Sequence, residues 1–162
     1  MYNVQMARPV IDNNQSLVVE SHSKASKQIF HLSLSALNIE EIRNFYEVNF
    51  ACNAKRISKS DQEIHIDFFG HQLTFVQVSL ENHRQVSEPN EPGYPLVHFG
   101  AALPYYLWFN LKKRLEQNNV NFFVEPHLKF EGQLHEHYVM LVKDPSENVI
   151  EIKSFTQTND WL

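Results

Sequence analysis

Val97-His98-Phe99-Gly100-Ala101 decides the fold, because Phe30-His31-Leu32-Ser33-Leu34 is a near-copy of it in the first half of the chain. Each stretch begins an apolar run that leads into a helix-like segment, and each holds one histidine at the same place. A repeated segment of this kind predicts a duplicated architecture. The matched histidines are expected to converge on one site.

The repeat extends to the ends of the two halves, at residues 67–75 and 144–152. Both are turn signals followed by a β-rich run, with Gly70 supplying the turn in one and Pro145 with Asn148 in the other. When the two stretches are laid together, Thr74 falls opposite Glu151. Each half is therefore expected to close on its own hairpin.

The pattern between these landmarks predicts the order βαβββ twice. In the first half we expect a strand at 29–35, a helix capped by Asn38 with Glu41 three residues on, and strands at 55–58, 63–68 and 72–78. In the second half we expect a strand at 96–103, a helix at 105–118, strands at 121–124, 138–142 and 149–155, and a polar loop at 125–137. The core side of the second helix is predicted to carry Leu107, Trp108, Leu111 and Leu115.

These elements predict a single domain at 28–156, made of module one at 28–78, a Pro-rich connector at 79–95 and module two at 96–156. Residues 1–27 are rich in Asn, Ser, Gln and Lys, which is typical of a flexible arm. A chain of 162 residues with 43% hydrophobic content can build one core of ordinary size.

Charge and composition narrow the partners to small molecules or proteins. The net charge is -5, and no run of Lys and Arg offers an electrostatic surface for nucleic acid or an anionic membrane. No apolar stretch is long enough to span a membrane, and the start of the chain lacks the features of a signal peptide. With only one cysteine, Cys52, the chain cannot form an internal disulfide. We expect Cys52 to be a small buried residue rather than a reactive thiol. The expected compartment is the cytoplasm.

His31, His98 and Glu151 form the candidate metal-binding set. Two imidazoles and one carboxylate from three strands make a facial triad, which holds a divalent ion and leaves positions open for water, substrate or dioxygen. Glu151 interrupts an apolar run, so a positive partner is expected beside it, and a metal ion is the economical choice. The competing interpretation is that these are ordinary structural residues, since the chain has nine histidines.

The βαβββ repeat, the three candidate ligands and the closing stretch 143–152 resemble the vicinal oxygen chelate superfamily of glyoxalases, bleomycin-resistance proteins and extradiol dioxygenases. The likeness covers roughly residues 28–156. The stretches 67–72, 97–100 and 125–133 are similar to a bacterial glyoxalase-like subgroup of that superfamily. The resemblance implies an α+β fold in which the two modules form a curved mixed sheet around a cavity, with helices on the outer face, and a homodimer.

The resemblance also implies a metal-dependent enzyme that chelates two adjacent oxygens of a small substrate. Fe(II) or Mn(II) is the favoured ion, with Zn(II) or Ni(II) as further options. The spacing of His31, His98 and Glu151 resembles that of an extradiol ring-cleaving dioxygenase, which makes this the first activity to consider. A glyoxalase-type lyase or isomerase is an alternative, although Thr74 and Gln72 stand where glyoxalase I has a fourth, acidic ligand. Two further alternatives remain. One is a non-catalytic binding protein of the bleomycin-resistance type, and the other is a fosfomycin-type transferase to which Lys129 and Lys153 could contribute.

Further residues are weaker candidates. His71 and Tyr138 are candidate catalytic groups, although a turn cap and a core position are the competing interpretations. Gln72 and Thr74 are candidate substrate-binding residues. The stretch 125–137 is a candidate lid, and His135 with His137 could bind metal adventitiously if the loop were extended.

Overall fold

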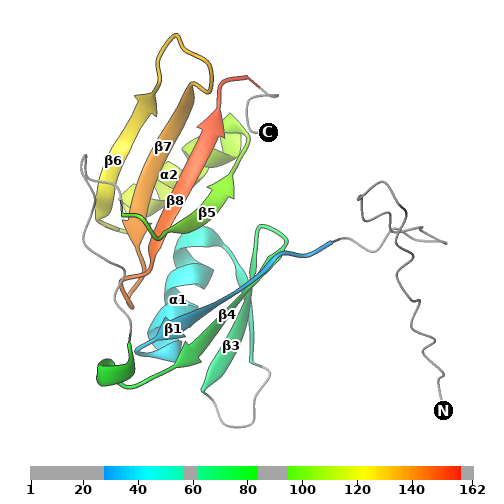
Figure 1. Ribbon diagram of the computed structural model, residues 1–162, viewed down its shortest axis with the longest axis vertical. Helices are drawn as coiled ribbons and strands as arrows, with labels where there is room; N and C mark the ends of the chain where they lie inside the picture. Colours follow the sequence, from blue (N-terminus) through cyan, green and yellow to red (C-terminus); the bar gives the residue numbers. More distant parts are fainter. Residues whose placement is uncertain (1–27, 57–61, 84–94, 158–162) are drawn as a thin grey trace, which may run out of the picture.

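The chain forms two βαβββ units that lie one above the other (Figure 1). This computed structural model describes residues 28–56, 62–83 and 95–157. The predicted arm at 1–27 and most of the predicted connector at 79–95 lie outside these ranges. The elements are β1 (His31–Ala36), α1 (Ile39–Phe50), β2 (Asn53–Arg56), β3 (Glu63–Phe68), β4 (His71–Gln77), η1 (Leu80–Asn82), β5 (Phe99–Ala102), α2 (Tyr105–Gln117), β6 (Phe122–Lys129), β7 (His137–Lys143) and β8 (Val149–Phe155). The predicted α+β class with paired βαβββ modules is confirmed.

Each module builds a four-stranded mixed sheet, with strand order β1-β4-β3-β2 in the first and β5-β8-β7-β6 in the second. The first strand of each module pairs in parallel with the last, and in equivalent register: Ser33 lies beside Thr74, and Gly100 beside Glu151. The predicted equivalence of Thr74 and Glu151 is therefore confirmed by strand pairing. In both sheets the first strand is an edge, so β1 and β5 each have one unpaired side among the described residues.

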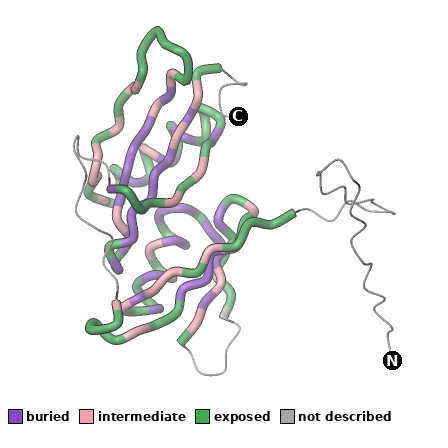
Figure 2. Tube along the Cα trace, viewed as in Figure 1, coloured by how far each residue is buried: buried purple, intermediate pink, exposed green. Residues whose placement is uncertain are grey.

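One helix covers one face of each sheet, and the buried residues lie mainly along the helices and the inner strands (Figure 2). The side chain of Asn38 caps α1 as predicted, accepting hydrogen bonds from the backbone N–H groups of Glu40 at 2.9 Å and Glu41 at 3.3 Å. In α2 the buried stripe is Trp108, Leu111 and Leu115. Leu107 was expected in that stripe but is 40% exposed, because it lies at the edge of the narrow face that meets the sheet.

The predicted loop at 125–137 is partly wrong, because β6 continues through Pro126 to Lys129. The pairing of β6 with β7 shifts register between Val124 and His127. Proline has no N–H for the strand ladder, and a bulge at this place accommodates it. The bulge allows the strand to resume, so that only residues 130–136 form the connection to β7.

The turn between β7 and β8 joins the two modules. Its Asp144 carboxylate accepts hydrogen bonds from the backbone N–H groups of Ser146 and Asn148 and from the hydroxyl of Tyr46 in α1 at 3.2 Å. The Ser146 hydroxyl accepts from the backbone N–H of Leu37 at 2.9 Å. The repeated turn motif thus acts as a clamp between the modules. No helix in the described ranges is long and apolar enough to cross a membrane.

Candidate metal centre

The site is built on His98, just before β5, and Glu151 in the middle of β8. The Nε2 atom of His98 lies 3.3 Å from Oε2 of Glu151. The other ring nitrogen, Nδ1, is 2.9 Å from the backbone carbonyl of Pro95. A carbonyl oxygen only accepts, so Nδ1 carries the proton and Nε2 is the atom directed at Glu151. Ligating histidines are oriented in this way in metal sites.

The two atoms fit adjacent positions on one metal ion. With bonds of about 2.1 Å, neighbouring ligand atoms stand about 3.0 Å apart in octahedral and about 3.4 Å apart in tetrahedral geometry. The 3.3 Å separation lies between these values. The Glu151 side chain is 9% exposed and that of His98 is 29% exposed, so the pair is shielded but open on one side.

Lys153 is the positive partner that the sequence required for Glu151. Its Nζ lies 2.8 Å from the same Oε2 atom that faces His98. Glu151 and Lys153 are two positions apart on β8 and therefore project from the same face of the sheet. The buried carboxylate is thus neutralised by a side chain of its own strand, which removes the need for a metal as the only compensating charge.

His31 lies elsewhere in the chain, exposed at the start of β1, where its Nε2 is 3.2 Å from the Ser33 hydroxyl. Within the described ranges, no three His, Cys, Asp or Glu side chains converge in a manner that could hold a metal ion. One copy of the chain therefore assembles two of the three expected ligands, His98 and Glu151.

Thr74 and Gln72 contact His65 of β3, a residue that was not among the predicted site residues. The amide Nε2 of Gln72 donates to Nδ1 of His65 at 2.8 Å, and the Thr74 hydroxyl lies 2.9 Å from the same nitrogen. The imidazole Nε2 lies 3.3 Å from the carboxylate of Glu63. Both candidate substrate-binding residues are therefore engaged with an imidazole.

A cavity of about 650 Å³ adjoins this network on the first sheet. His71 borders it, but its Nδ1 accepts a hydrogen bond from the backbone N–H of Phe30 at 3.1 Å, which matches the competing interpretation of a local cap. The polar side chains along the cavity are Asn53, Lys55, His65, Asp67, His71 and Gln72.

Tyr138 lies on the α2 side of the second sheet, which matches the competing interpretation of a core position. Its ring packs against Tyr105 and Trp108 of α2, with centroids 4.9 and 5.4 Å away. Neighbouring positions on a strand point to opposite faces. Leu141, which pairs with Glu151, is three positions along β7, so Tyr138 projects from the face opposite to the carboxylate.

The thiol of Cys52 is buried. Burial is the main cause that raises the pKa of its thiol to about 12, and the charge of Asp67 adds to the effect. The thiol therefore stays protonated and weakly nucleophilic. This agrees with the structural role expected from the sequence.

The missed residues had a signal in the sequence. Glu63, His65 and Asp67 alternate with Ile64, Ile66 and Phe68, and this period of two places His65 on the face away from the core. The same rule puts Lys153 beside Glu151. Distances between strands, which decide the partners, have no such local signal.

Comparison with known proteins gives solved structures of the same fold. No family model matches the sequence, and no curated protein matches it. A glyoxalase/bleomycin resistance protein/dioxygenase from Alicyclobacillus acidocaldarius is 29% identical, with a TM-score of 0.69, and the match covers 84% of this chain and 97% of that one.

Two more distant structures share the fold. The genomically encoded fosfomycin resistance protein of Listeria monocytogenes is 11% identical over 85% of this chain and 100% of that one, with a TM-score of 0.61. A lactoylglutathione lyase from Agrobacterium tumefaciens is 14% identical over 81% of this chain and 96% of that one, with a TM-score of 0.54. The paired βαβββ modules and these structural likenesses support the vicinal oxygen chelate superfamily for this chain.

Proposed function

We propose that the protein is a metal-dependent enzyme acting on a small, oxygen-rich molecule, with His98 and Glu151 of one copy and His31 of a second copy as the metal ligands. The observation that carries this proposal is the 3.3 Å approach of Nε2 of His98 to Oε2 of Glu151, with Nδ1 held by the Pro95 carbonyl. This arrangement presents two ligand atoms to a common point.

The need for a second copy follows from the edges of the two sheets. β1 and β5 are both edge strands, and apolar residues precede each of them: Ile29 and Phe30 are 60% and 59% exposed, and Leu96 and Val97 are 69% and 62% exposed. Exposed apolar edges favour association. A homodimer that brings β1 of one copy beside β5 of the other would bury these residues and carry His31 towards His98.

The side chains of this chain have distinct roles in the proposed site. When bound, a divalent ion such as Fe(II) or Mn(II) supplies Lewis-acid chemistry for two adjacent substrate oxygens. Glu151 contributes negative charge in a shielded position, and the Pro95 carbonyl orients His98. Val139 and Leu141 form an apolar floor on the same face of β7 and limit the access of water. The Lys153 ammonium can donate to a bound oxygen once it leaves Glu151.

Ring-cleaving dioxygenase chemistry is the activity we test first, because the three ligands would leave open positions for substrate and dioxygen. A lyase or isomerase of the glyoxalase type is less well supported. Thr74, at the position equivalent to Glu151, is neutral and lies against His65.

A non-catalytic small-molecule binder is the second candidate, and the Lys153–Glu151 ion pair favours it. At 2.8 Å the ammonium satisfies the carboxylate without a metal ion. In this case the cup would bind its ligand with the His98–Glu151 pair as polar contacts alone.

Elemental analysis separates the two candidates. Protein purified without a metal-affinity tag, under conditions that preserve ferrous iron, is compared with Glu151→Gln. The enzyme proposal expects about one ion per chain in the wild type and its loss in the variant. If neither protein holds or takes up an ion, the binder is the better description.

Mixing two defective variants tests whether the site is shared between copies. His31→Ala and Glu151→Ala are each expected to lose the ion. In a mixed dimer both defects fall in one site, and the other site has all three ligands. Unfolding and refolding the two together should therefore restore about one ion per mixed dimer. No recovery, with mixed dimers shown to be present, would mean that the three ligands do not come from two copies as proposed.

A further inference from the structure

His137, at the start of β7, has a buried ring nitrogen without a partner. The residue is 4% exposed. Its Nδ1 lies 2.6 Å from the backbone carbonyl of His135, so this nitrogen carries the proton. Nε2 of the neutral ring is then a bare acceptor, and it has no hydrogen-bond partner among the described residues. A buried polar atom left unsatisfied in this way requires an explanation.

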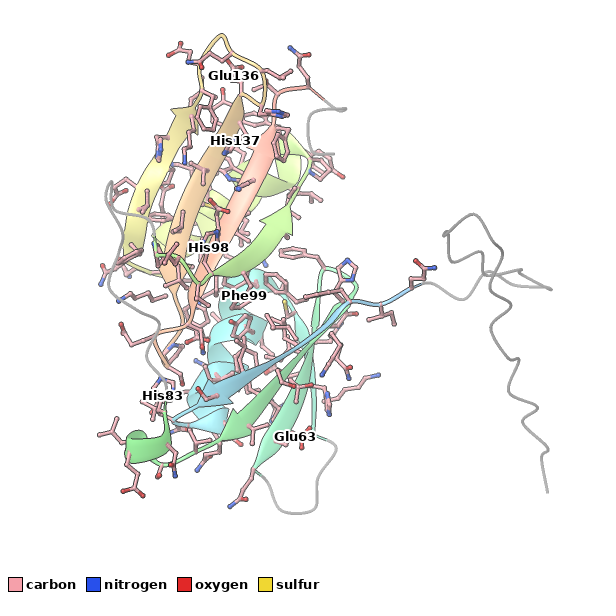
Figure 3. All side chains as sticks on the ribbon, viewed as in Figure 1. Glu63, His83, His98, Phe99, Glu136 and His137 are labelled. Atoms are coloured by element: carbon pink, nitrogen blue, oxygen red, sulfur yellow. The ribbon has the colours of Figure 1, made fainter. Side chains whose placement is uncertain are left out.

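His137 lies on the same face of the second sheet as the candidate metal centre. His137, Val139 and Leu141 are spaced two apart along β7 and therefore share a face. His137 pairs with Phe155 of β8, and Leu141 pairs with Glu151 of the same strand. Phe155 is four positions along β8 from Glu151, a distance of about 13 Å. Figure 3 shows His98 near the beginning of β5 and His137 at the other end of the sheet.

Aromatic rings flank the imidazole. The ring centroid of Phe155 is 5.2 Å from that of His137, and the ring centroid of Phe130 is 5.7 Å from it. Phe130 begins the connection to β7, has a φ of 58° and is 45% exposed. Because Nε2 is buried, a ligand reaches it only if a flanking ring moves, and Phe130 is the more exposed of the two rings.

We propose that Nε2 of His137 accepts a hydrogen bond from a hydroxyl group at the far end of the ligand. For the other end of that ligand, whose oxygens would lie at His98 and Glu151, the inference rests on the proposed function. The hydroxyl subsite itself depends only on His137. The ligand class is therefore a molecule with paired oxygens at one end and a hydroxyl about 13 Å away.

The bare nitrogen needs a hydrogen-bond donor, and a hydroxyl is the donor we propose. A lone pair repels a carboxylate or phosphate oxygen, whereas a hydroxyl can donate to it. A metal ion is disfavoured, because the rings that flank His137, those of Phe130 and Phe155, carry no ligating atoms. The apolar flanks add area for a ring or chain but no competing polar partner.

Phenol and anisole are suitable probes, because they share a ring and only phenol has a hydroxyl to donate. With the full-length protein, ¹⁵N NMR of labelled histidines should first show Nε2 of His137 unprotonated. Phenol should shift this resonance saturably and anisole should not. By calorimetry, phenol should bind about fivefold to tenfold more tightly than anisole beside His137.

His137→Phe keeps the ring and removes the acceptor, so it should bind phenol and anisole equally. His127→Phe is the matched control, since His127 is an exposed histidine of the adjacent strand whose Nδ1 also lies against a carbonyl, and it should keep the preference. A proton on Nε2, equal binding of the probes to the wild type, or an unchanged His137 resonance would overturn the proposal. The NMR result stands even if His137→Phe does not fold.

The metal-free protein and Glu151→Gln are measured alongside. A retained preference for phenol in a protein that takes up no ion would support the hydroxyl subsite and count against the metal enzyme. Normal ion uptake with no preference would overturn the subsite and leave the proposed function standing.

Discussion

Lys153 and His98 approach the same oxygen of Glu151, at 2.8 and 3.3 Å. The carboxylate is therefore held by an ammonium group on one side while an imidazole nitrogen faces it on the other. A metal ion entering beside His98 would have to compete with Lys153 for this oxygen. We therefore expect Lys153 to lower the affinity of the proposed site for a metal ion.

Replacing Lys153 with Met should tighten Mn(II) binding by about tenfold, equivalent to about 1.4 kcal/mol. The substitution keeps the length of the side chain but removes both the competing ion pair and the repulsion between two cations. Isothermal titration calorimetry measures the change. Lys112→Met, which removes a lysine paired with Glu116 on α2, should leave the affinity unchanged. Weaker Mn(II) binding in Lys153→Met would show that the lysine supports the site.

Alanine at Gly100 should destabilise the protein by about 3 kcal/mol or more and weaken metal binding. An added Cβ would lie 1.7 Å from the backbone carbonyl oxygen of Glu151, so β5 would have to move away from β8. Urea denaturation measures the loss. Gly132→Ala is the comparison: its Cβ meets open space, and its φ of 69° should cost only about 1–2 kcal/mol. Similar losses for the two variants would contradict this account.

Removing the Tyr46 hydroxyl should destabilise the contact between the modules by about 1–2 kcal/mol. Tyr46→Phe leaves the ring in place but takes one donor from the buried Asp144 carboxylate, 3.2 Å away. The free energy of unfolding is measured in urea at neutral pH. Tyr106→Phe should have no effect, because Tyr106 is 64% exposed. An equal loss in both variants would argue against the clamp.

Stability should fall as the pH rises from about 4 to about 6. Burial raises the pKa of Asp144 from 3.8 to about 6, against the opposing effect of its hydrogen bonds from Asn148, Ser146 and Tyr46. In this window the folded protein keeps a proton that the unfolded chain has released, so deprotonation works against folding. The full loss is about 2–3 kcal/mol and is complete above the folded-state pKa.

Asp144→Asn is the test of that pH dependence, because its side chain does not titrate. The free energy of unfolding of the wild type, minus that of the variant, should decrease between pH 4 and pH 6 and then stay level. A difference that is constant or increases across this window would show that Asp144 is not the group responsible.

The sequence by itself determined the repeated architecture and the places of the key residues in it. Alternation of apolar residues, the Asn38 cap and the turn residues act over a few positions, so they predict elements without knowledge of the rest of the chain. The equivalence of Thr74 and Glu151 followed from the same local signals, since register in a repeat is set by turn and strand lengths. The bulge at Pro126 was not predicted, because it depends on pairing with β7, and local sequence signals extend over only a few residues.

Only the tertiary structure decided which of these residues meet. The face of Tyr138, the engagement of Thr74 with His65 and the bare nitrogen of His137 depend on distances between strands that are remote in sequence. The positive partner of Glu151 was expected from the cost of burying a charge, but its identity as Lys153 required the positions of both side chains. The separation of His31 from His98 and Glu151 likewise comes from how the modules pack, and packing is a property of the whole chain.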